Sequence, residues 1–262
     1  MITTLTSRAR AADGWLLRLA SLLTLLIAWQ AAAGIAHDPG LLPSPLATAL
    51  VAYEQVRSGD LLFHVGMTLL RVAVAFICAM LVGTAIGIAV GRHPTLDTFF
   101  DSWLVIALNI PALVTIVLCY VWFGLTETAA IFAVALNKAP TVVTIIREGA
   151  RSLDRSLAEM VRLYQVPPGR ILWRIILPQL APSLMGAARS GLALTWKIVL
   201  VVELLGRPNG VGFEIRRFFN FFDIAGILAY TLVFVAVILA VEALLLKPLD
   251  RRISKWRRVS AC

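Results

Sequence analysis

Two lysines, Lys138 and Lys197, lie near the middle of long apolar segments of the sequence. A charged group at the centre of a membrane helix costs about 2.5 to 3.5 kcal/mol on insertion scales, so it marks a functional site by default. Each lysine is about ten residues from the ends of its segment, a rise of about 15 Å, which is too far for its stem to reach a lipid interface easily. We expect both side chains to face protein or water, and one or both to give an anion a positive field.

Polar neighbours extend this candidate path. Thr195 precedes Lys197 in the same segment, and Asn109 precedes Pro111 in another, where a kink could widen the path or act as a hinge. A second interpretation stays open, in which a buried lysine pairs with Glu203 or with a backbone carbonyl. Arg71 and Arg189 lie nearer to segment ends, so snorkelling or helix packing explains them at least as well as function. The candidate substrate-path residues are Lys197, Lys138, Thr195, Asn109 and Glu203.

Residue patterns for catalysis are missing from the sequence. No Lys follows a Gly, which excludes the Gly-Lys-Ser/Thr end of a phosphate-binding loop and therefore ATP hydrolysis by this chain. The three His residues stand alone near segment ends, and the three Cys residues have no metal-ligand spacing. No Ser/His/Asp or paired-carboxylate arrangement is visible. We therefore expect no catalytic residue, no metal site and no enzymatic activity.

The composition is that of a membrane protein. The hydrophobic residues make up 60% of the 262-residue chain and the charged residues only 15%, against roughly 25% in soluble domains. Mean hydropathy is +0.86. About twenty helical residues cross the hydrocarbon layer, which predicts an all-α, polytopic transmembrane helical bundle of about six spans, with residues 1–262 forming a single transmembrane domain. The expected spans are Trp15 to Ala36, His64 to Gly91, Phe99 to Phe123, Thr128 to Ile146, Ser183 to Leu205 and Ile224 to Leu246.

The net charge of +9 comes from basic residues in the loops between apolar segments, which argues against a nucleic-acid partner. Cytoplasmic loops of membrane proteins are enriched in Lys and Arg. The basic residues near both chain ends and in the 147–174 region fall on one side of the predicted membrane, so both termini are predicted to be cytoplasmic. An N-terminal signal peptide cleaved after Ala33 is an alternative that the topology does not decide. Pro45 predicts a short periplasmic helix that extends to Val56.

A polar segment over residues 147–179 is too long for a simple connection between two spans. Residues 152–164 carry apolar side chains at helical spacing with an arginine-rich opposite face, which predicts an amphipathic helix. After a turn at 165–169, a second apolar stripe predicts a short helix over 170–177 that Pro178 ends. Two short helices that meet at an elbow form a stiff lever with an apolar seat. The second stripe consists of Ile171, Leu172, Ile175 and Ile176.

This segment resembles the cytoplasmic loop of permeases of binding-protein-dependent ATP-binding-cassette (ABC) importers, which carries Glu-Ala-Ala, then Gly, then Leu-Pro. Glu159 stands at the Glu position, and Leu177 with Pro178 forms the closing pair. Gln165 replaces the Gly, so the turn must be made differently, by residues 166–169. The resemblance covers most of the chain and is greatest to the nitrate, sulfonate and taurine branch. It includes the segments Leu42 to Pro45, Thr68 to Arg71 and Glu203 to Phe213.

The resemblance implies a type I ABC importer permease fold in the bacterial inner membrane. It also implies partners: ABC ATPase subunits that bind the ATP, a periplasmic solute-binding protein, and a second copy of the chain in a homodimer. No cofactor belongs to the chain itself. The second short helix would dock into a groove of the ATPase and transmit its closure to the spans. The residues expected to couple are Glu159, Arg162, Gln165, Gly169, Ile171, Leu172, Ile175 and Pro178.

Several alternatives stay open at this point. The two short helices could lie on the lipid headgroups instead of meeting an ATPase. A stand-alone secondary transporter or channel is a second possibility, although inverted repeats and matched broken helices, which would favour it, are not visible in the sequence. A membrane scaffold without transport would leave the midmembrane lysines unexplained. The sequence decides neither between a homodimer and a paralogous heterodimer nor which solute is carried.

Overall fold

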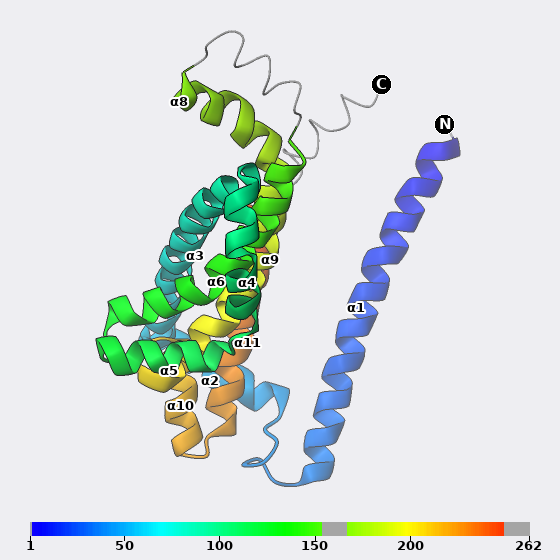
Figure 1. Ribbon diagram of the computed structural model, residues 1–262. Coiled ribbons are helices and arrows are strands. Elements are labelled where there is room, and N and C mark those ends of the chain that lie inside the picture. Colours follow the sequence, from blue (N-terminus) through cyan, green and yellow to red (C-terminus); the bar gives the residue numbers. More distant parts are fainter. Residues whose placement is uncertain (1, 154–166, 249–262) are drawn as a thin grey trace. The chain divides into compact units, whose positions relative to one another are not determined.

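The computed structural model describes residues 2–153 and 167–248, and every regular element in these ranges is helical (Figure 1). The all-α prediction is therefore confirmed for the described part of the chain. Two compact units are distinguished, Met1–Leu62 with Ile215–Val233 and Phe63–Glu214 with Phe234–Cys262. The helices are α1 (Ile2–Ala36), α2 (Pro45–Ser58), α3 (Asp60–Arg92), α4 (Pro94–Asn109), α5 (Ala112–Phe123), α6 (Glu127–Arg151), α8 (Pro168–Ile171), η1 (Leu172–Ile176), α9 (Leu177–Gly206), α10 (Val211–Asn220), α11 (Ile224–Val241) and η2 (Glu242–Leu246).

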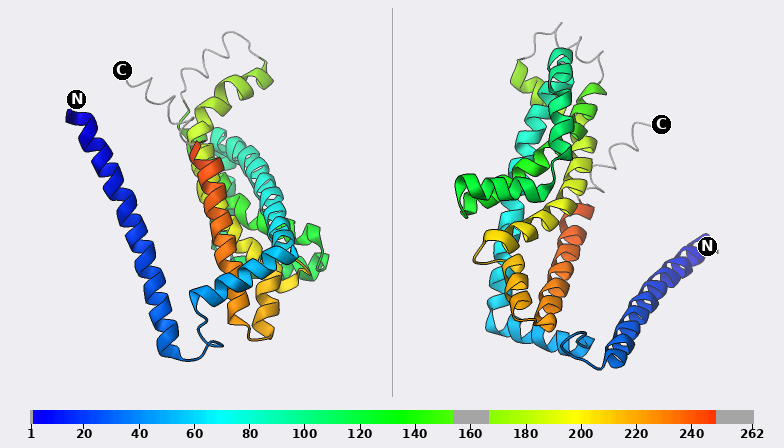
Figure 2. Two further views of the ribbon diagram at one scale, coloured as in Figure 1. Left: turned by 180° about the vertical axis from the view of Figure 1, so that it is seen from behind. Right: turned by 60° about the horizontal axis from the view of Figure 1, so that its bottom comes forward.

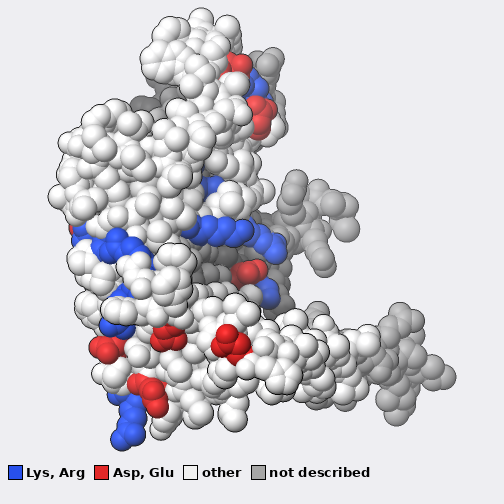
Figure 3. Space-filling view, turned by 90° about the horizontal axis from the view of Figure 1, so that it is seen from below, with Lys and Arg blue, Asp and Glu red and all other residues white. Residues whose placement is uncertain are grey.

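Four helical stretches of the described chain are long and apolar enough to cross a membrane, Leu19–Ala36, Asp60–Arg92, Glu127–Arg151 and Ile224–Leu244. They correspond to four of the six expected spans. α9, with 30 residues, has the length for a fifth, and it carries Arg189, Lys197 and Glu203. The face shown in Figure 3 agrees with a membrane setting, because most of its described surface carries no charge.

The expected span from Phe99 to Phe123 is not one continuous helix but a broken pair of helices. The chain breaks there into α4 and α5, which are bent by 94° to each other, so that α5 runs across the direction of α4 (Figure 1). Pro111 causes the break, because it has no N–H to donate and forces the preceding residue out of the helical region. Ile110 accordingly has φ −70° and ψ 123°. The kink predicted at this proline is thus a full change of direction.

A row of glycines brings α3 against α6. Gly83, Gly87 and Gly91 are spaced four apart, so they share one face of α3. A Cβ built on Gly83 would lie 2.6 Å from Cβ of Val142, and one on Gly87 would lie 2.8 Å from Cβ of Ile146. Helices in lipid associate through such close backbone approach, because lipid supplies no hydrophobic force between them.

Beside this glycine row lies a buried apolar core that joins the second half of α6 to η1 and to the first half of α9. Val142, Ile146 and Ala150 of α6 pack with Ile176 at the end of η1 and with Leu180 and Ala187 of α9. Ile146 and Leu180 are fully buried. The fixed part of this unit is therefore α3, α6 and α9.

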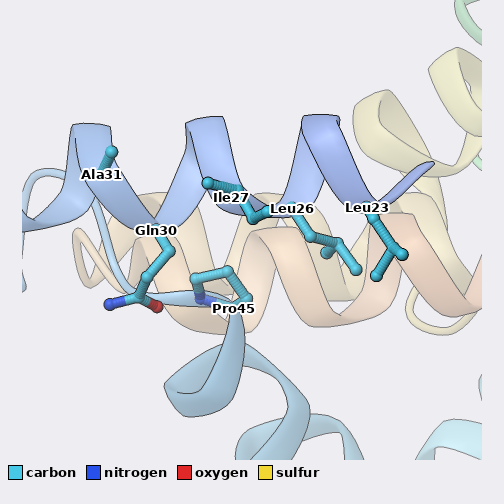
Figure 4. Close-up of a pocket in the computed structure, with 6 residues that line it drawn as sticks. All are labelled: Leu23, Leu26, Ile27, Gln30, Ala31 and Pro45. Atoms are coloured by element: carbon cyan, nitrogen blue, oxygen red, sulfur yellow. The ribbon is translucent and has the colours of Figure 1, made fainter. Parts of the chain in front are cut away.

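In the other unit, the short helix predicted after Pro45 is confirmed as α2. The Ser44 side chain accepts a hydrogen bond from the Ala47 amide, and Gly59, with φ +87°, ends the helix in the left-handed region that favours glycine. The Trp29 indole of α1 donates a hydrogen bond of 3.1 Å to the Pro43 carbonyl. A shallow apolar pocket lies between α1 and Pro45 (Figure 4). Its lining includes no cationic or acidic side chain, so the search for an ion path turns to the unit that contains α9.

Enlarging Gly87 tests the glycine row. Because its added Cβ would stand 2.9 Å from the Val143 carbonyl oxygen, we expect Gly87→Ala to lower stability by about 1 to 3 kcal/mol, the cost of overpacking a close contact. Gly66→Ala is the matched control on α3, because nothing lies within 4 Å of its Cβ position. The midpoint of thermal unfolding in detergent measures both. Equal midpoints for the two variants would contradict this account of the α3 and α6 contact.

Candidate translocation path and coupling segment

Arg71 of α3 is the centre of a buried ionic network, with only 2% of its surface exposed. Its guanidinium donates to Glu203 of α9 at 2.7 Å, to Glu127 at the start of α6 at 2.5 and 3.1 Å, and to the Asn209 carbonyl at 2.9 Å. It also donates to the Asn209 side chain. Glu127 in turn pairs with Arg207. Two arginines and two carboxylates thus tie α3, α6 and the end of α9 together, and such bidentate, charge-assisted contacts are the strong ones.

The loop after α9 folds around the second oxygen of Glu203. That oxygen accepts hydrogen bonds of 2.9 Å from the Thr68 hydroxyl and from the Gly212 amide. The Val211 amide donates to the Thr68 hydroxyl at 2.9 Å, and the Gly210 amide donates to His64 at 3.0 Å. Gly210 has φ +110°, and a Cβ at this residue would collide with the Glu203 carboxylate. Gly210 is therefore required both by backbone conformation and by space.

This network corrects two sequence interpretations. Arg71 does not snorkel towards a lipid interface, because it is buried and held by two carboxylates. Glu203, which is 0% exposed, pairs with that arginine and not with Lys138. Its partner could not be assigned from the sequence, because Arg71 and Glu203 are 132 positions apart. The signal that was available is their presence in two of the segments that carry the family resemblance.

Lys138 lies in the interior of the unit. Its side chain is 2% exposed, and its Nζ has no hydrogen-bond partner among the described residues. The stem passes Gly191 of α9, where a Cβ would lie 3.4 Å from the lysine Cε and 3.3 Å from the Phe76 ring. The prediction that Lys138 faces protein is thus confirmed. Its surroundings are apolar, which is an expensive place for an unpaired ammonium.

Lys197 occupies the opposite situation, because it is exposed on α9. Residues at spacings of three and four share a helix face, and the exposed residues of this stretch include Gly186, Ser190, Ala193, Lys197 and Val201. We refer to these five residues as the α9 face. The ammonium therefore lies on an exposed face of α9 that has the small residues Gly186, Ser190 and Ala193 on one side and the apolar Val201 on the other, with Leu194 also exposed three positions away.

The other two predicted path residues do not join the α9 face. Thr195 is 0% exposed, and its hydroxyl donates to the Gly191 carbonyl at 2.9 Å. Asn109, at the end of α4, is exposed, and its amide donates to the Val105 carbonyl at 2.7 Å. Of the five candidates, the structure places Lys197 on an open face of the chain, Asn109 at the break before Pro111, and Lys138, Thr195 and Glu203 in the interior.

The predicted coupling residues are partly described. Glu159, Arg162 and Gln165 lie outside the described residues. Gly169 is exposed in α8, and Ile171 and Ile175 are half-buried. Leu172 is 36% exposed and its neighbour Trp173 is 72% exposed, whereas Ile176 is 5% exposed. One side of this segment therefore packs under the spans, and another side presents a leucine and a tryptophan outwards.

The expectation that Pro178 ends a short helix is wrong. α8, η1 and α9 follow one another without a break from Pro168 to Gly206, and the first two lead obliquely into the third (Figures 1 and 2). Pro178 has no N–H, but it falls in the first turn of α9, directly after the π-helical turn Leu172–Ile176. There the Leu177 amide donates to Leu172, five residues earlier. The widened turn accommodates the proline, so the helix bends and continues.

A profile of the family described as binding-protein-dependent transport system inner membrane component matches residues 62–255. The chain belongs to this family. It is therefore a permease subunit of an ABC importer, and the alternative of a stand-alone secondary transporter or channel is not supported. The matched residues include the Arg71 network, the α9 face and the coupling segment.

Relatives agree with this membership. An aliphatic sulfonates transport permease protein of Bacillus subtilis is 27% identical over 93% of this chain and 88% of its own length. A taurine transport system permease protein of Escherichia coli is 26% identical over 92% and 89%. A bicarbonate transport system permease protein of Synechococcus elongatus is 26% identical over 78% and 77%.

Solved structures show the same fold. An inward-facing MetNI methionine ABC transporter matches with a TM-score of 0.64 at 18% identity, over 77% of this chain and 98% of that one. An amino acid ABC transporter described as crystallised with histidines matches with a TM-score of 0.57 at 17% identity, over 79% and 96%. The predicted type I importer permease fold is thereby confirmed.

Removing the central guanidinium tests the network. Arg71→Met leaves Glu203 buried without its cation, so we expect a loss of stability of about 3 to 5 kcal/mol. Arg71→Met with Glu203→Met should recover part of that loss, because no uncompensated charge remains at the pair. Arg57→Met, at an exposed position of α2, is the control. Thermal unfolding of the purified protein measures all three, and a double variant less stable than Arg71→Met would argue against an ion pair at the centre of the network.

Proposed function

We propose that this permease carries a small anion, of the sulfonate, taurine, nitrate or bicarbonate type, and that Lys197 supplies positive charge along its path. The observation that carries the proposal is the position of Lys197, which is exposed on the α9 face in line with the small residues Gly186, Ser190 and Ala193. The relatives support it, because the solutes in their names, aliphatic sulfonates, taurine and bicarbonate, all bear an anionic group.

Lys197 also supports a second copy of the chain. An ammonium near the middle of a membrane helix is tolerated only beside water or protein and not beside lipid tails. Within one chain the α9 face is open, so another chain must cover it and enclose water. A homodimer with a hydrated path between the two α9 faces meets both requirements. Lys138, buried behind Gly191, would add a weaker field from inside each subunit.

The remaining parts of the proposal follow from the family. ATP is bound and hydrolysed by separate ATPase subunits, the permease chain has no catalytic residue or cofactor of its own, and a periplasmic solute-binding protein delivers the anion. Residues 1–262 act as one permease domain with both termini in the cytoplasm of a bacterium. An elongated anion and a compact anion need binding pockets of different size. We therefore assign much of the solute selectivity to the binding protein.

The exposed side of the coupling segment is proposed to dock into the ATPase. Leu172 and Trp173 face outwards, whereas Ile176 is fixed in the core with Ile146 and Leu180. Movement of the exposed side, which carries Leu172 and Trp173, is therefore transmitted through Ile176 to the end of α6 and the start of α9. Glu159, with Arg162 and Gln165, would complete the elbow at the ATPase surface, where a carboxylate among arginines can hold charge-assisted hydrogen bonds.

Neutralising Lys197 tests the anion path. We expect Lys197→Met to assemble with its ATPase but to import an anion about tenfold more slowly, because the path loses a positive charge that raises the local concentration of anions. Lys197→Arg should be milder, and Leu194→Met, on an exposed neighbour in α9, should import normally. Uptake of taurine, an alkanesulfonate and bicarbonate into cells measures the effect. Normal anion uptake by Lys197→Met, or a transported solute without negative charge, would overturn the assignment.

The two sides of the coupling segment should respond differently to charge. Leu172→Asp changes an exposed position, so we expect the permease to stay folded and to lose its ATPase on purification. Ile176→Asp buries a carboxylate without a partner and should lower the thermal midpoint of the permease itself. Co-purification stoichiometry and unfolding separate the two outcomes. Full ATPase stoichiometry with Leu172→Asp would instead favour a helix that lies on lipid headgroups.

A further inference from the structure

Four charged residues connect the inner ends of α4 and α6. Arg147 of α6 pairs with Asp97 at 2.9 Å and with Asp101 at 2.7 Å, and Arg151 also pairs with Asp97. Both pairs of residues are spaced by four, so the aspartates share one face of α4 and the arginines share one face of α6. We call this set the ion-pair ladder. None of its four members is among the residues expected to couple to the ATPase or among the candidate substrate-path residues.

The ladder joins α4 to α6 through side-chain ion pairs. α4 has no buried residue along its 16 positions, which means that little apolar packing holds it. Its outer end is separated from α5 by the 94° break at Ile110 and Pro111. Because α4 is broken from α5 at one end and ion-paired to α6 at the other, it can tilt about the break. The ion pairs then make α4 follow the movement of α6.

The α6 end of the ladder lies where α6 packs closely against both α3 and α9. A Cβ at Gly91 of α3 would lie 2.8 Å from the Ala150 Cβ, and one at Gly149 would lie 2.8 Å from Cβ of Ser183 in α9. The last turn of α6 therefore packs against α3 on one side and against the start of α9 on another. Ile176, in the described part of the coupling segment, belongs to the same buried cluster as Ile146 and Ala150, which lie on either side of Arg147 in the sequence. A displacement of Ile176 therefore acts on the turn that carries Arg147 and Arg151.

We propose that the ion-pair ladder transmits movement of the coupling segment to α4, which swings about the break at Asn109 and Pro111. The inference rests on the proposed docking of the ATPase to the coupling segment, and it assigns Asp97, Asp101, Arg147 and Arg151 as positioning residues for transport. α4 then follows α6 during the transport cycle, while α5 keeps its own direction.

The ladder differs from ordinary surface ion pairs, which contribute little. Arg147 is 11% exposed and Asp97 is 18% exposed, and each of them contacts more than one opposite charge. Networks that are half removed from water are screened less by salt than isolated exposed pairs. Glu148 offers a comparison within the same turn, because it is 57% exposed and pairs only with Arg147 and Arg151 of its own helix.

The experiment uses the complete permease with its ATPase in lipid. The native cysteines Cys78, Cys119 and Cys262 are first replaced by alanine. A single reporter cysteine is then placed on α4 by Trp103→Cys or on α6 by Leu136→Cys, positions that are 62% and 46% exposed. The rate of reaction with a maleimide is measured without nucleotide and with ATP plus vanadate, in the intact ladder and in Asp97→Asn with Asp101→Asn.

With the ladder intact, we expect nucleotide to change the reaction rate at both reporters. In the double Asn variant the change at the α6 reporter should persist and the change at the α4 reporter should be lost. Glu148→Gln should leave both changes intact. Exchanging the signs, with Asp97→Arg, Asp101→Arg, Arg147→Asp and Arg151→Asp, should restore the response of α4, which a role in folding alone would not predict. If the double variant does not assemble, Asp101→Asn alone, whose carboxylate is 54% exposed, is expected to weaken the α4 response selectively.

A nucleotide-dependent change at the α4 reporter that survives the double Asn substitution would overturn the inference, as would the absence of any change there with the ladder intact. The amount of ATPase that co-purifies separates this failure from that of the proposed function. A double variant with full ATPase stoichiometry and a normal α4 response overturns the ladder alone. An unaltered permease that retains no ATPase overturns the proposed docking and the ladder with it.

Discussion

The hydrogen bonds of the buried Arg71 guanidinium hold together the start of α6, the end of α9 and the middle of α3. It holds Glu203 and Glu127 at once, so α3, α6 and α9 meet at one cation. With Arg207, the network is balanced by two positive and two negative side chains, and Thr68 with the Gly212 amide completes the hydrogen bonds of Glu203. Because these charges pair with one another, Arg71 and Arg207 are not available to a passing solute, whereas Lys197 is exposed on α9.

The same three helices are joined at their inner ends by a different kind of contact. There the glycine row of α3 accepts the β-branched side chains of α6, and the start of α9 packs on Gly149. An ionic clamp at one end and close backbone packing at the other make α3, α6 and α9 a stiff group. α4 is the exception, held by charges on its inner end and broken from α5 at its outer end. The unit thus combines a rigid group, α3, α6 and α9, with one helix, α4, whose orientation can change.

Much of this arrangement could be predicted from the sequence, because long apolar segments and isolated lysines are local signals. The helix after Pro45 and the positions of most spans followed from composition and proline placement. The Arg71 network could not be predicted, since its partners lie 56 and 132 positions away. Pro111 and Pro178 show a further limit. Both remove one backbone donor, yet the first breaks the chain direction and the second is absorbed by a π turn, and the difference depends on which residues pack around each proline.

The charges of α9 have a consequence for how the protein is made. α9 carries Arg189, Lys197 and Glu203 within one segment, and it is synthesised after α3 and α6. Arg71 and Glu127 are therefore made before Glu203 and Asn209, which complete the hydrogen bonds of Arg71. Because a charged side chain enters lipid at lower cost beside an opposite charge, we expect Arg71 to favour the insertion of α9 by offering Glu203 a partner.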